Sequence, residues 1–344
     1  MNAESYSGIN TYQRCPNLYF YKYECNLQPI KRSVALQQGT DAHEMLKVFF
    51  LALQQGENTD GAWAAVMDYA SGLLAENKKI AFEDEQIEYH ELVDETIRWI
   101  ASYCDQYGEE WEVLHAEEEF VMILDSGKVI SFTPDLVVRD RSGAVWIIDH
   151  KTTAAIPESG IPFGDMQALL YYAGVKDMYP ECAGFIFNRI RKKTPTQPRL
   201  TKTGAKRVAD LKRIDTTYET LRDFLQAEAP ELMADPAHQQ RLAELRDAPE
   251  RWFWTENVYV NETTEQIILD DAAAVLAQMD ASIETGMWPR NLQEDRGYKS
   301  CNKCSFKPLC QAQMLGWDTE VLLKMEYEAR DPKNPYEGET DGEN

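Results

Sequence analysis

The spacing of apolar residues divides the chain into helical and extended segments. Apolar residues recur at helical intervals in four stretches, which predict helices over residues 37–53, 61–76, 83–106 and 164–178. Short runs rich in β-branched residues, separated by turn-forming Asp, Ser and Gly, predict strands over residues 111–124, 128–140, 143–151, 182–190 and 251–260. The remainder of residues 214–286 has a mostly helical pattern.

This order of elements predicts an α/β fold. The first three strands follow one another through short turns, so we expect them to form a meander. The helix and the strand that come next extend the same sheet, which gives a mixed central sheet flanked by helices. We predict a helical N-terminal region, an α/β core, a helical C-terminal region and an acidic disordered tail, over residues 1–110, 111–213, 214–325 and 326–344.

The distribution of charge changes the choice of partner. The formal net charge of −23 disfavours a nucleic acid, because phosphates repel an acidic surface. Residues 188–213 depart from this background, with ten Lys or Arg and a single acid, Asp210. This segment predicts a strip that binds DNA phosphates; a solvated loop and helix start is the alternative. The candidate DNA-binding residues are Arg189, Arg191, Lys192, Lys193 and Lys202.

The sequence predicts a cytoplasmic protein with no membrane partner. No apolar run approaches the roughly 20 residues of a membrane span. The N-terminal sequence MNAESYSGIN lacks the basic-then-apolar pattern of a secretory signal. Seven cysteines are an odd number, which disfavours a secreted disulfide framework.

Two acids and a lysine stand at the ends of apolar runs. Asp135 ends "SFTPD", and Asp149 and Lys151 end "VWIIDHK". Two carboxylates on neighbouring strands persist as a pair where a cation neutralises them, and hard oxygen ligands select Mg²⁺ or Mn²⁺. Lys151 shares a face with Asp149 and can hold the attacking water, whereas His150 points the other way and offers its backbone carbonyl as a metal ligand. A surface salt bridge between strand ends is the alternative.

The segments "TPD…WIIDHKTT", "GTDAHEML" and "QALLYYAG" together resemble the signature of PD-(D/E)XK nucleases, in their RecB-like branch. The resemblance implies a restriction-endonuclease-like core in which His43 is a further metal ligand. It also places Gln167 and Tyr171, one helical turn apart, on the DNA side of the site. Ordinary helix positions are the alternative for all three residues. Many relatives have Glu where this chain has Asp149, and Glu119 is a further candidate for the metal shell.

The cysteines near the C-terminus have the spacing of a metal centre. Cys301, Cys304 and Cys310 form C-x2-C-x5-C, which suits a soft metal and requires a fourth ligand. No Cys or His follows Cys310, so Cys15 in "YQRCPNLYF" is the candidate. This arrangement resembles the iron–sulfur staple of RecB-like nucleases, including AddB-type subunits and CRISPR-associated exonucleases. The resemblance implies a 4Fe–4S cluster that clamps the two ends of the chain, and a structural Zn²⁺ held by the same thiolates is the alternative.

The resemblance implies a metal-dependent DNA exonuclease that leaves 5′-phosphate and 3′-hydroxyl ends. DNA recombination, repair or phage DNA processing would suit such an enzyme, with single- or double-stranded DNA as substrate. A recombinase, a helicase or a single-strand-binding protein is a candidate partner. Two alternatives come from other functional classes: a non-catalytic DNA-binding or assembly subunit that keeps the nuclease fold, and a four-cysteine zinc module that binds a protein.

Overall fold

The computed structural model describes most of the chain. The described residues are 3–30, 34–77, 83–107, 111–153, 165–202, 204, 206–248, 252–292 and 301–330. Of the tail predicted to be disordered, residues 331–344 lie outside the described part of the chain. The start of that prediction is wrong, because residues Tyr327–Ala329 form a short strand, β10.

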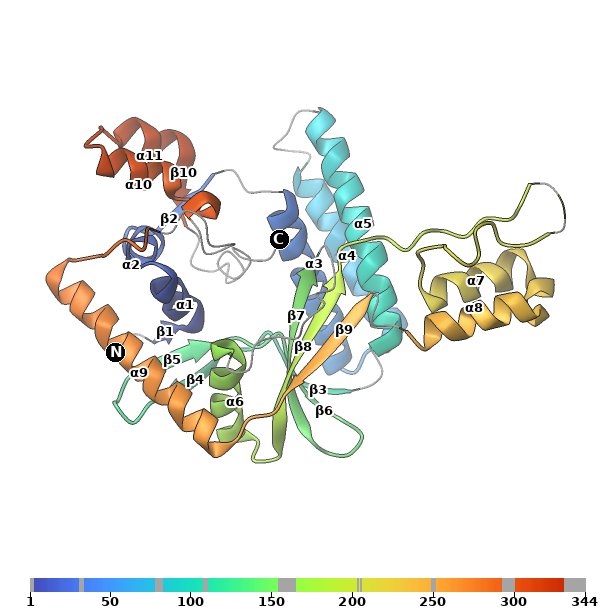
Figure 1. Ribbon diagram of the computed structural model, residues 1–344, viewed down its shortest axis with the longest axis horizontal. Helices are drawn as coiled ribbons and strands as arrows, with labels where there is room; N and C mark the ends of the chain where they lie inside the picture. The colour runs from blue at the N-terminus through green and yellow to red at the C-terminus, as the bar shows by residue number, and fades with distance from the viewer. Residues whose placement is uncertain are drawn as a thin grey trace.

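A five-stranded sheet lies at the centre of the protein, in the order β3-β6-β7-β8-β9 (Figure 1). Neighbouring strands in this sheet are antiparallel, except β7 and β8, which are parallel. The predicted α/β fold with a mixed sheet is therefore confirmed. Its strands are β3 (Glu112–Ala116), β6 (Leu136–Arg139), β7 (Val145–Thr153), β8 (Cys182–Arg191) and β9 (Phe253–Val258).

The predicted meander is wrong, because each of its first two runs breaks into two strands. The first run forms β3 and β4 (Phe120–Ile123), and the second forms β5 (Val129–Phe132) and β6. The first break contains Glu117 at φ 52°, outside the extended region. The second contains Pro134, which has no N–H to donate to a ladder. Strands β4 and β5 join β1 (Glu4–Ser5) in a separate sheet, in the order β1-β5-β4.

Helices cover both faces of the central sheet and bury two apolar cores. Along β7, Ile147 belongs to one core and Ile148 to the other, so this strand is apolar on both faces. The helices around the Ile148 core are α3 (Val34–Gln54), α4 (Thr59–Asn77) and α5 (Glu83–Tyr107). Those around the Ile147 core are α1 (Tyr6–Arg14), α6 (Met166–Met178) and α9 (Glu262–Thr285).

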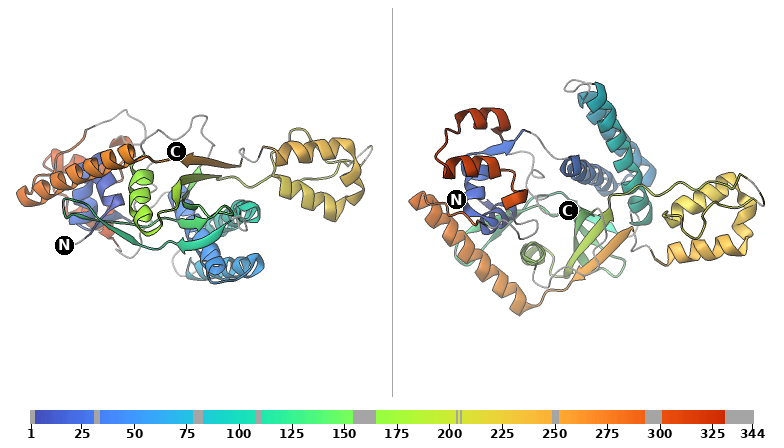
Figure 2. Two further views of the ribbon diagram at one scale, coloured as in Figure 1. Left: turned by 90° about the horizontal axis from the view of Figure 1, so that it is seen from below. Right: turned by 45° about the horizontal axis from the view of Figure 1, so that its top comes forward.

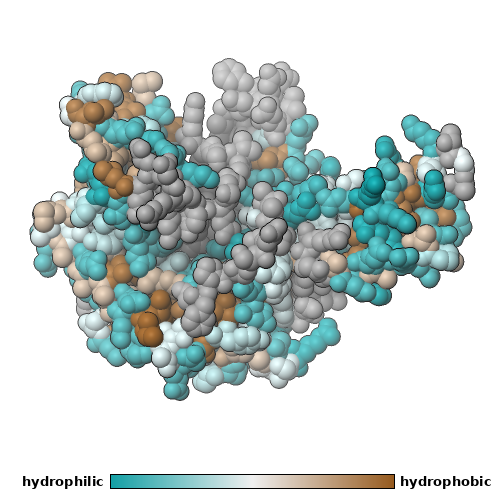
Figure 3. All heavy atoms as spheres, viewed as in Figure 1, coloured by the Kyte–Doolittle hydropathy of each residue, from teal (hydrophilic) through white to brown (hydrophobic). Residues whose placement is uncertain are grey.

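Residues 192–252 leave the sheet after β8 and return to it at β9. This segment, here called the arm, projects from the rest of the protein (Figures 1 and 2), and its visible surface is largely hydrophilic (Figure 3). It contains α7 (Tyr218–Glu228), η2 (Pro230–Ala234) and α8 (Pro236–Arg246). The arm has its own small core, formed by Val208, Leu221, Leu225, Ala229, Leu242 and Leu245. The sheet thus continues past residue 213, where the sequence-based division placed the end of the α/β core.

The N- and C-terminal parts of the chain lie side by side. Strand β10 pairs antiparallel with β2 (Leu27–Pro29). A small core joins Leu18 and Tyr21 to Phe306, Leu309 and Tyr327. The other elements of this region are α2 (Pro16–Tyr19), η1 (Phe20–Glu24), η5 (Cys301–Lys303), α10 (Lys307–Met314) and α11 (Glu320–Glu326). The two ends therefore meet through their own contacts, and clamping by a metal cluster stays a prediction.

Candidate metal centre

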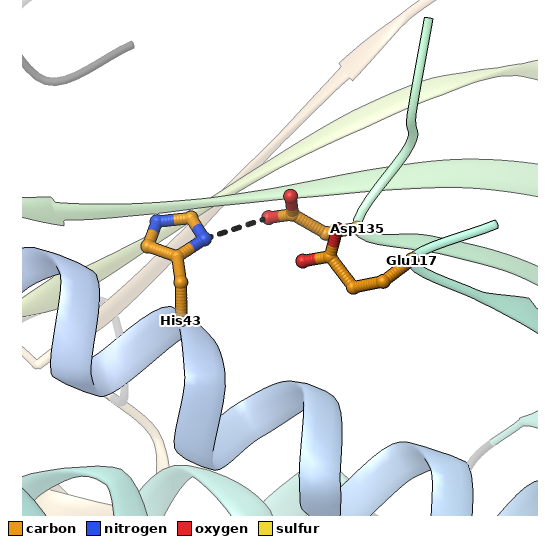
Figure 4. A group of neighbouring side chains, drawn as sticks. All are labelled: His43, Glu117 and Asp135. Carbon is orange, nitrogen blue, oxygen red and sulfur yellow. Dashed lines mark ion pairs between the residues drawn. The ribbon is translucent and has the colours of Figure 1, made fainter. Parts of the chain in front are cut away.

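Three side chains from three elements converge beside the central sheet: His43 from α3, Glu117 from the segment after β3, and Asp135 from the residue before β6 (Figure 4). One ligand atom of each lies within 4.8 Å of one atom of both others. His43 Nδ1 is 3.4 Å from Asp135 Oδ2. His43 and Asp135 are buried and Glu117 is half-buried. An imidazole and two carboxylates in this arrangement can hold a divalent metal ion.

Glu117 is the member of this group that sequence analysis did not identify. It has left-handed backbone geometry, with φ 52°, and its N–H donates to the carbonyl of Asp135 at 3.0 Å. A non-glycine residue in this region is strained, and such residues gather at functional sites. The acid proposed from the sequence, Glu119, is exposed. The run of three glutamates at 117–119 indicated an acidic candidate at this place. Strand alternation does not predict the backbone turn that brings Glu117, and not its neighbours, to the metal group.

The protonation states within the group are coupled. Burial disfavours the imidazolium form of His43, but the adjacent Asp135 carboxylate outweighs burial and raises the pKa of His43. Burial by itself would raise the pKa of Asp135; the charge of His43 and a hydrogen bond from His150 instead lower it well below the usual range. A cation bound here would replace the proton on His43, so metal binding and proton release are linked.

His150 supports Asp135 from the opposite side of β7 to Asp149. Its backbone N–H donates to Asp135 Oδ2 at 2.6 Å, and its ring Nδ1 is 3.4 Å from the same oxygen. The other ring nitrogen lies 2.9 Å from the hydroxyl of Tyr103, which in turn accepts from Asn188 at 2.6 Å. The side chain is buried, and burial lowers the pKa of His150. Its role as a metal ligand through the backbone carbonyl stays a prediction.

Asp149, Lys151 and Gln167 form a second hydrogen-bonded unit. Lys151 Nζ is 3.0 Å from Asp149 Oδ2, and Gln167 Nε2 donates to Asp149 Oδ1 at 2.8 Å. Asp149 is only 1% exposed. It lies close to the metal group, because its negative charge contributes to the raised pKa of His43. Asp149 is nevertheless not a member of the His43–Glu117–Asp135 group, and its role as a metal ligand stays a prediction.

Tyr171 lies in the core, not on an open surface. It is 1% exposed, and its ring stacks on Phe132 at 4.8 Å between centroids and meets Tyr6 edge-on at 5.6 Å. The resemblance placed both Gln167 and Tyr171 on the DNA side of the site, but the two side chains lie in different environments. Gln167 reaches Asp149, whereas Tyr171 packs among aromatic rings. A catalytic role for Tyr171 stays a prediction.

The basic strip divides into residues beside the site and residues on the arm. Arg189 pairs in register with Lys151 across β7 and β8, and its guanidinium lies 5.9 Å from the Trp254 ring centroid. Arg191 lies over Trp252 and contacts Asp215, which Lys193 also contacts at 2.5 Å. The backbone N–H of Lys192 donates to Thr153 at the end of β7, and Lys202 is exposed on the arm.

All four cysteines of the predicted cluster line one cavity of about 300 Å³. Cys15 accepts a hydrogen bond from the backbone N–H of Asn291 at 3.5 Å, and Cys301 lies 3.7 Å from the Asn291 carbonyl. The cavity also has three cationic side chains in its wall, from Arg14, Arg290 and Lys307. Sequence reasoning thus selected cysteines that the fold brings together. The identity of a bound group stays a prediction.

The helices of the described residues are all too short or too polar to cross a membrane.

Comparisons with known proteins relate the chain to one superfamily. A model of the PD-(D/E)XK nuclease superfamily matches residues 3–311. Among solved structures, SSO0001 is similar at 15% identity and a TM-score of 0.30, with 71% of this chain and 81% of that chain covered. A protein of Eubacterium rectale named "Putative exonuclease" is similar at 12% identity and a TM-score of 0.38, with 84% of each chain covered. No curated protein sequence matches significantly.

Proposed function

Because the chain belongs to the PD-(D/E)XK nuclease superfamily, we propose that it is a metal-dependent DNA exonuclease of the RecB-like branch. It hydrolyses phosphodiester bonds by in-line attack of water and leaves 5′-phosphate and 3′-hydroxyl ends. The observation that carries this proposal is the largely buried His43–Glu117–Asp135 group, together with the Asp149–Lys151 pair. DNA recombination, repair or phage DNA processing would use such an activity, and a recombinase, helicase or single-strand-binding protein is the expected kind of partner.

The donor set fits Mg²⁺ or Mn²⁺. Glu117 and Asp135 supply the hard oxygen ligands that both ions prefer, and His43 adds a nitrogen that Mn²⁺ accepts more readily. When bound, the ion would lower the pKa of the attacking water and offset the charge on the leaving oxygen. Because the pKa of His43 is raised, a metal ion competes with a proton for this imidazole, so the apparent affinity for metal should rise with pH.

Lys151 orients the water and stabilises the charge that grows on the phosphate. Its ammonium is half-buried and fixed by Asp149 at 3.0 Å. Asp149 is fixed in turn by the Gln167 amide at 2.8 Å. A hydrogen-bonded chain of this kind holds the ammonium in one place before the substrate arrives, so little reorganisation is required during the reaction.

The cysteine cavity supports a structural 4Fe–4S cluster more than a zinc ion. Zn–S bonds of about 2.3 Å put the four sulfurs of a zinc site roughly 4 Å apart. Within the described chain, no three cysteine sulfurs lie within 4.8 Å of one another. The cavity of about 300 Å³ and its cationic wall suit a larger, negatively charged group. Protein purified without oxygen should contain about four iron and four sulfide per chain; one zinc per chain instead would overturn this assignment.

The alternative is a non-catalytic subunit that keeps the nuclease fold and binds DNA or a partner protein. The presence of His43, Glu117, Asp135, Asp149 and Lys151 favours the enzyme, because converging carboxylates with perturbed pKa values are typical of a catalytic site. A zinc module that only binds protein would leave this cluster without a purpose.

A cleavage assay separates these functions. Labelled linear single- and double-stranded DNA and covalently closed circles are incubated with Mn²⁺, Mg²⁺ or chelator. The wild type should degrade linear DNA only when metal is present, and it should spare the circles. Lys151→Ala should abolish degradation. Lys176→Ala is the matched control. Lys176 Nζ forms a comparable ion pair with Glu265 Oε2, at 2.7 Å, and this pair is not part of the site. DNA binding without cleavage by the wild type would support the non-catalytic subunit.

A further inference from the structure

A row of three side chains crosses the sheet beside the proposed site. Lys151 on β7 is in register with Arg189 on β8, and Arg189 is in register with Trp254 on β9. Residues paired in register point to the same face of a sheet, and neighbouring strands are about 4.8 Å apart. All three side chains are half-buried. The guanidinium of Arg189 lies 5.9 Å from the centroid of the Trp254 ring, within the range of a cation–π contact.

The arginine two residues further along β8 has different contacts. Arg191 lies 4.9 Å from the centroid of Trp252, and Trp252 is only 4% exposed. Arg191 also contacts Asp215 Oδ1 at 3.3 Å, which supplies an opposite charge. Arg191 therefore has the contacts of a structural ion pair at the base of the arm. At Arg189 the ring of Trp254 lies against the guanidinium and orients its plane.

We propose that Arg189 binds the substrate phosphate next to the scissile one, and that Trp254 is the positioning residue that holds its guanidinium beside Lys151. This inference rests on the proposed nuclease function. The two cationic side chains start one strand spacing apart, so they can reach neighbouring groups of one phosphodiester chain. A planar guanidinium matches two phosphate oxygens, and a chain of net charge −23 needs fixed local cations to hold DNA.

The test compares DNA binding with catalysis in matched variants. The variants are Arg189→Gln, Trp254→Ala, Trp254→Phe and Tyr218→Ala. Tyr218 is the control, because its ring makes the same kind of contact with Arg222 at 5.5 Å, on α7 of the arm. Binding of a labelled single strand is measured in chelator over a range of salt concentrations. KM and kcat for the same strand are measured with Mn²⁺.

Arg189→Gln should raise KM on the order of tenfold and leave kcat within about twofold, because the lost contact is present in both ground and transition states. It should also make the slope of log K against log salt concentration less steep by about 0.7, which is the contribution of one phosphate contact on a single strand. Trp254→Ala should raise KM about threefold, and Trp254→Phe should restore it. If Trp254→Ala behaves like Tyr218→Ala, or if Arg189→Gln lowers kcat without changing KM, the proposal is wrong.

The binding measurement separates this proposal from the nuclease function. Suppose that the wild type does not cleave DNA, but that DNA binding by Arg189→Gln depends less steeply on salt, by the amount of one phosphate contact. The nuclease function then fails and the phosphate contact stands. If the wild type cleaves and the salt dependence is the same in wild type and Arg189→Gln, the phosphate contact fails and the nuclease function stands.

Discussion

Replacing Glu117 by Gln tests the composition of the metal group. The substitution keeps the size of the side chain and removes one of two carboxylates in the His43–Glu117–Asp135 group. It should change the stability of the protein in opposite directions with and without metal. In chelator the variant should be at least as stable as the wild type, because two nearby carboxylates repel each other. With metal present it should be less stable, because a ligand has been lost.

The magnitudes follow from the geometry. Two unit charges 4.8 Å apart repel by about 3.5 kcal/mol at an effective dielectric constant of 20. Glu117 is half-buried and His43 carries part of a compensating charge, so we expect a gain of up to about 1 kcal/mol without metal. Metal at 100 times its Kd stabilises the wild type by about 2.7 kcal/mol. If Glu117→Gln raises the Kd for metal about 100-fold, the same metal concentration stabilises the variant by only about 0.4 kcal/mol.

The assay is thermal unfolding of both proteins in chelator and with increasing Mn²⁺. A difference of about 2 kcal/mol corresponds, for a chain of 344 residues, to a loss of roughly 3 °C from the metal-induced rise in Tm. Glu119→Gln is the matched control, because Glu119 is exposed and belongs to the same run of glutamates. The reasoning is refuted if Glu117→Gln keeps the full metal-induced rise, or if Glu119→Gln loses it.

Three further predictions concern the scaffold. Burial raises the pKa of Glu4 to about 6, so the folded state binds a proton more tightly and stability should fall as the pH rises from about 4.5 to about 6. Glu4→Gln should remove this fall in the free energy of unfolding, measured in urea at several pH values. An unchanged dependence on pH would contradict the raised pKa of Glu4. Gly174→Ala should destabilise the protein by about 1–3 kcal/mol, because a methyl group on α6 would overlap the Phe132 ring. Gly72→Ala on α4 should stabilise it by about 0.5–1 kcal/mol, since that position is open; equal effects at the two glycines, measured by chemical denaturation, would contradict this account.

The sequence was sufficient where a local pattern determines the structure. The apolar run before Asp149 predicts a strand over residues 143–151, and β7 spans Val145–Thr153. Alternation then places Lys151 on the face of Asp149, and their contact at 3.0 Å agrees with that expectation. The spacing of the cysteines likewise selected residues that line one cavity.

Features that depend on backbone breaks or distant pairing could not be predicted in this way. Glu117 reaches the metal group because the chain turns at φ 52° after β3, and alternation along one long strand does not contain that turn. Helical periodicity identified the face that Tyr171 shares with Gln167, but not the depth at which the aromatic rings around Tyr171 pack. The charge count of the basic strip gave no indication that Asp215 and Trp252 would engage Arg191.

The most direct test of the central claim is the rate of DNA degradation as a function of Mn²⁺ concentration, in the wild type and in His43→Ala. Our account predicts a rate that saturates with Mn²⁺ in the wild type and a curve displaced to at least tenfold higher Mn²⁺ in the variant, because one of three ligands is missing. Identical curves, or no degradation by the wild type at any Mn²⁺ or Mg²⁺ concentration, would contradict it.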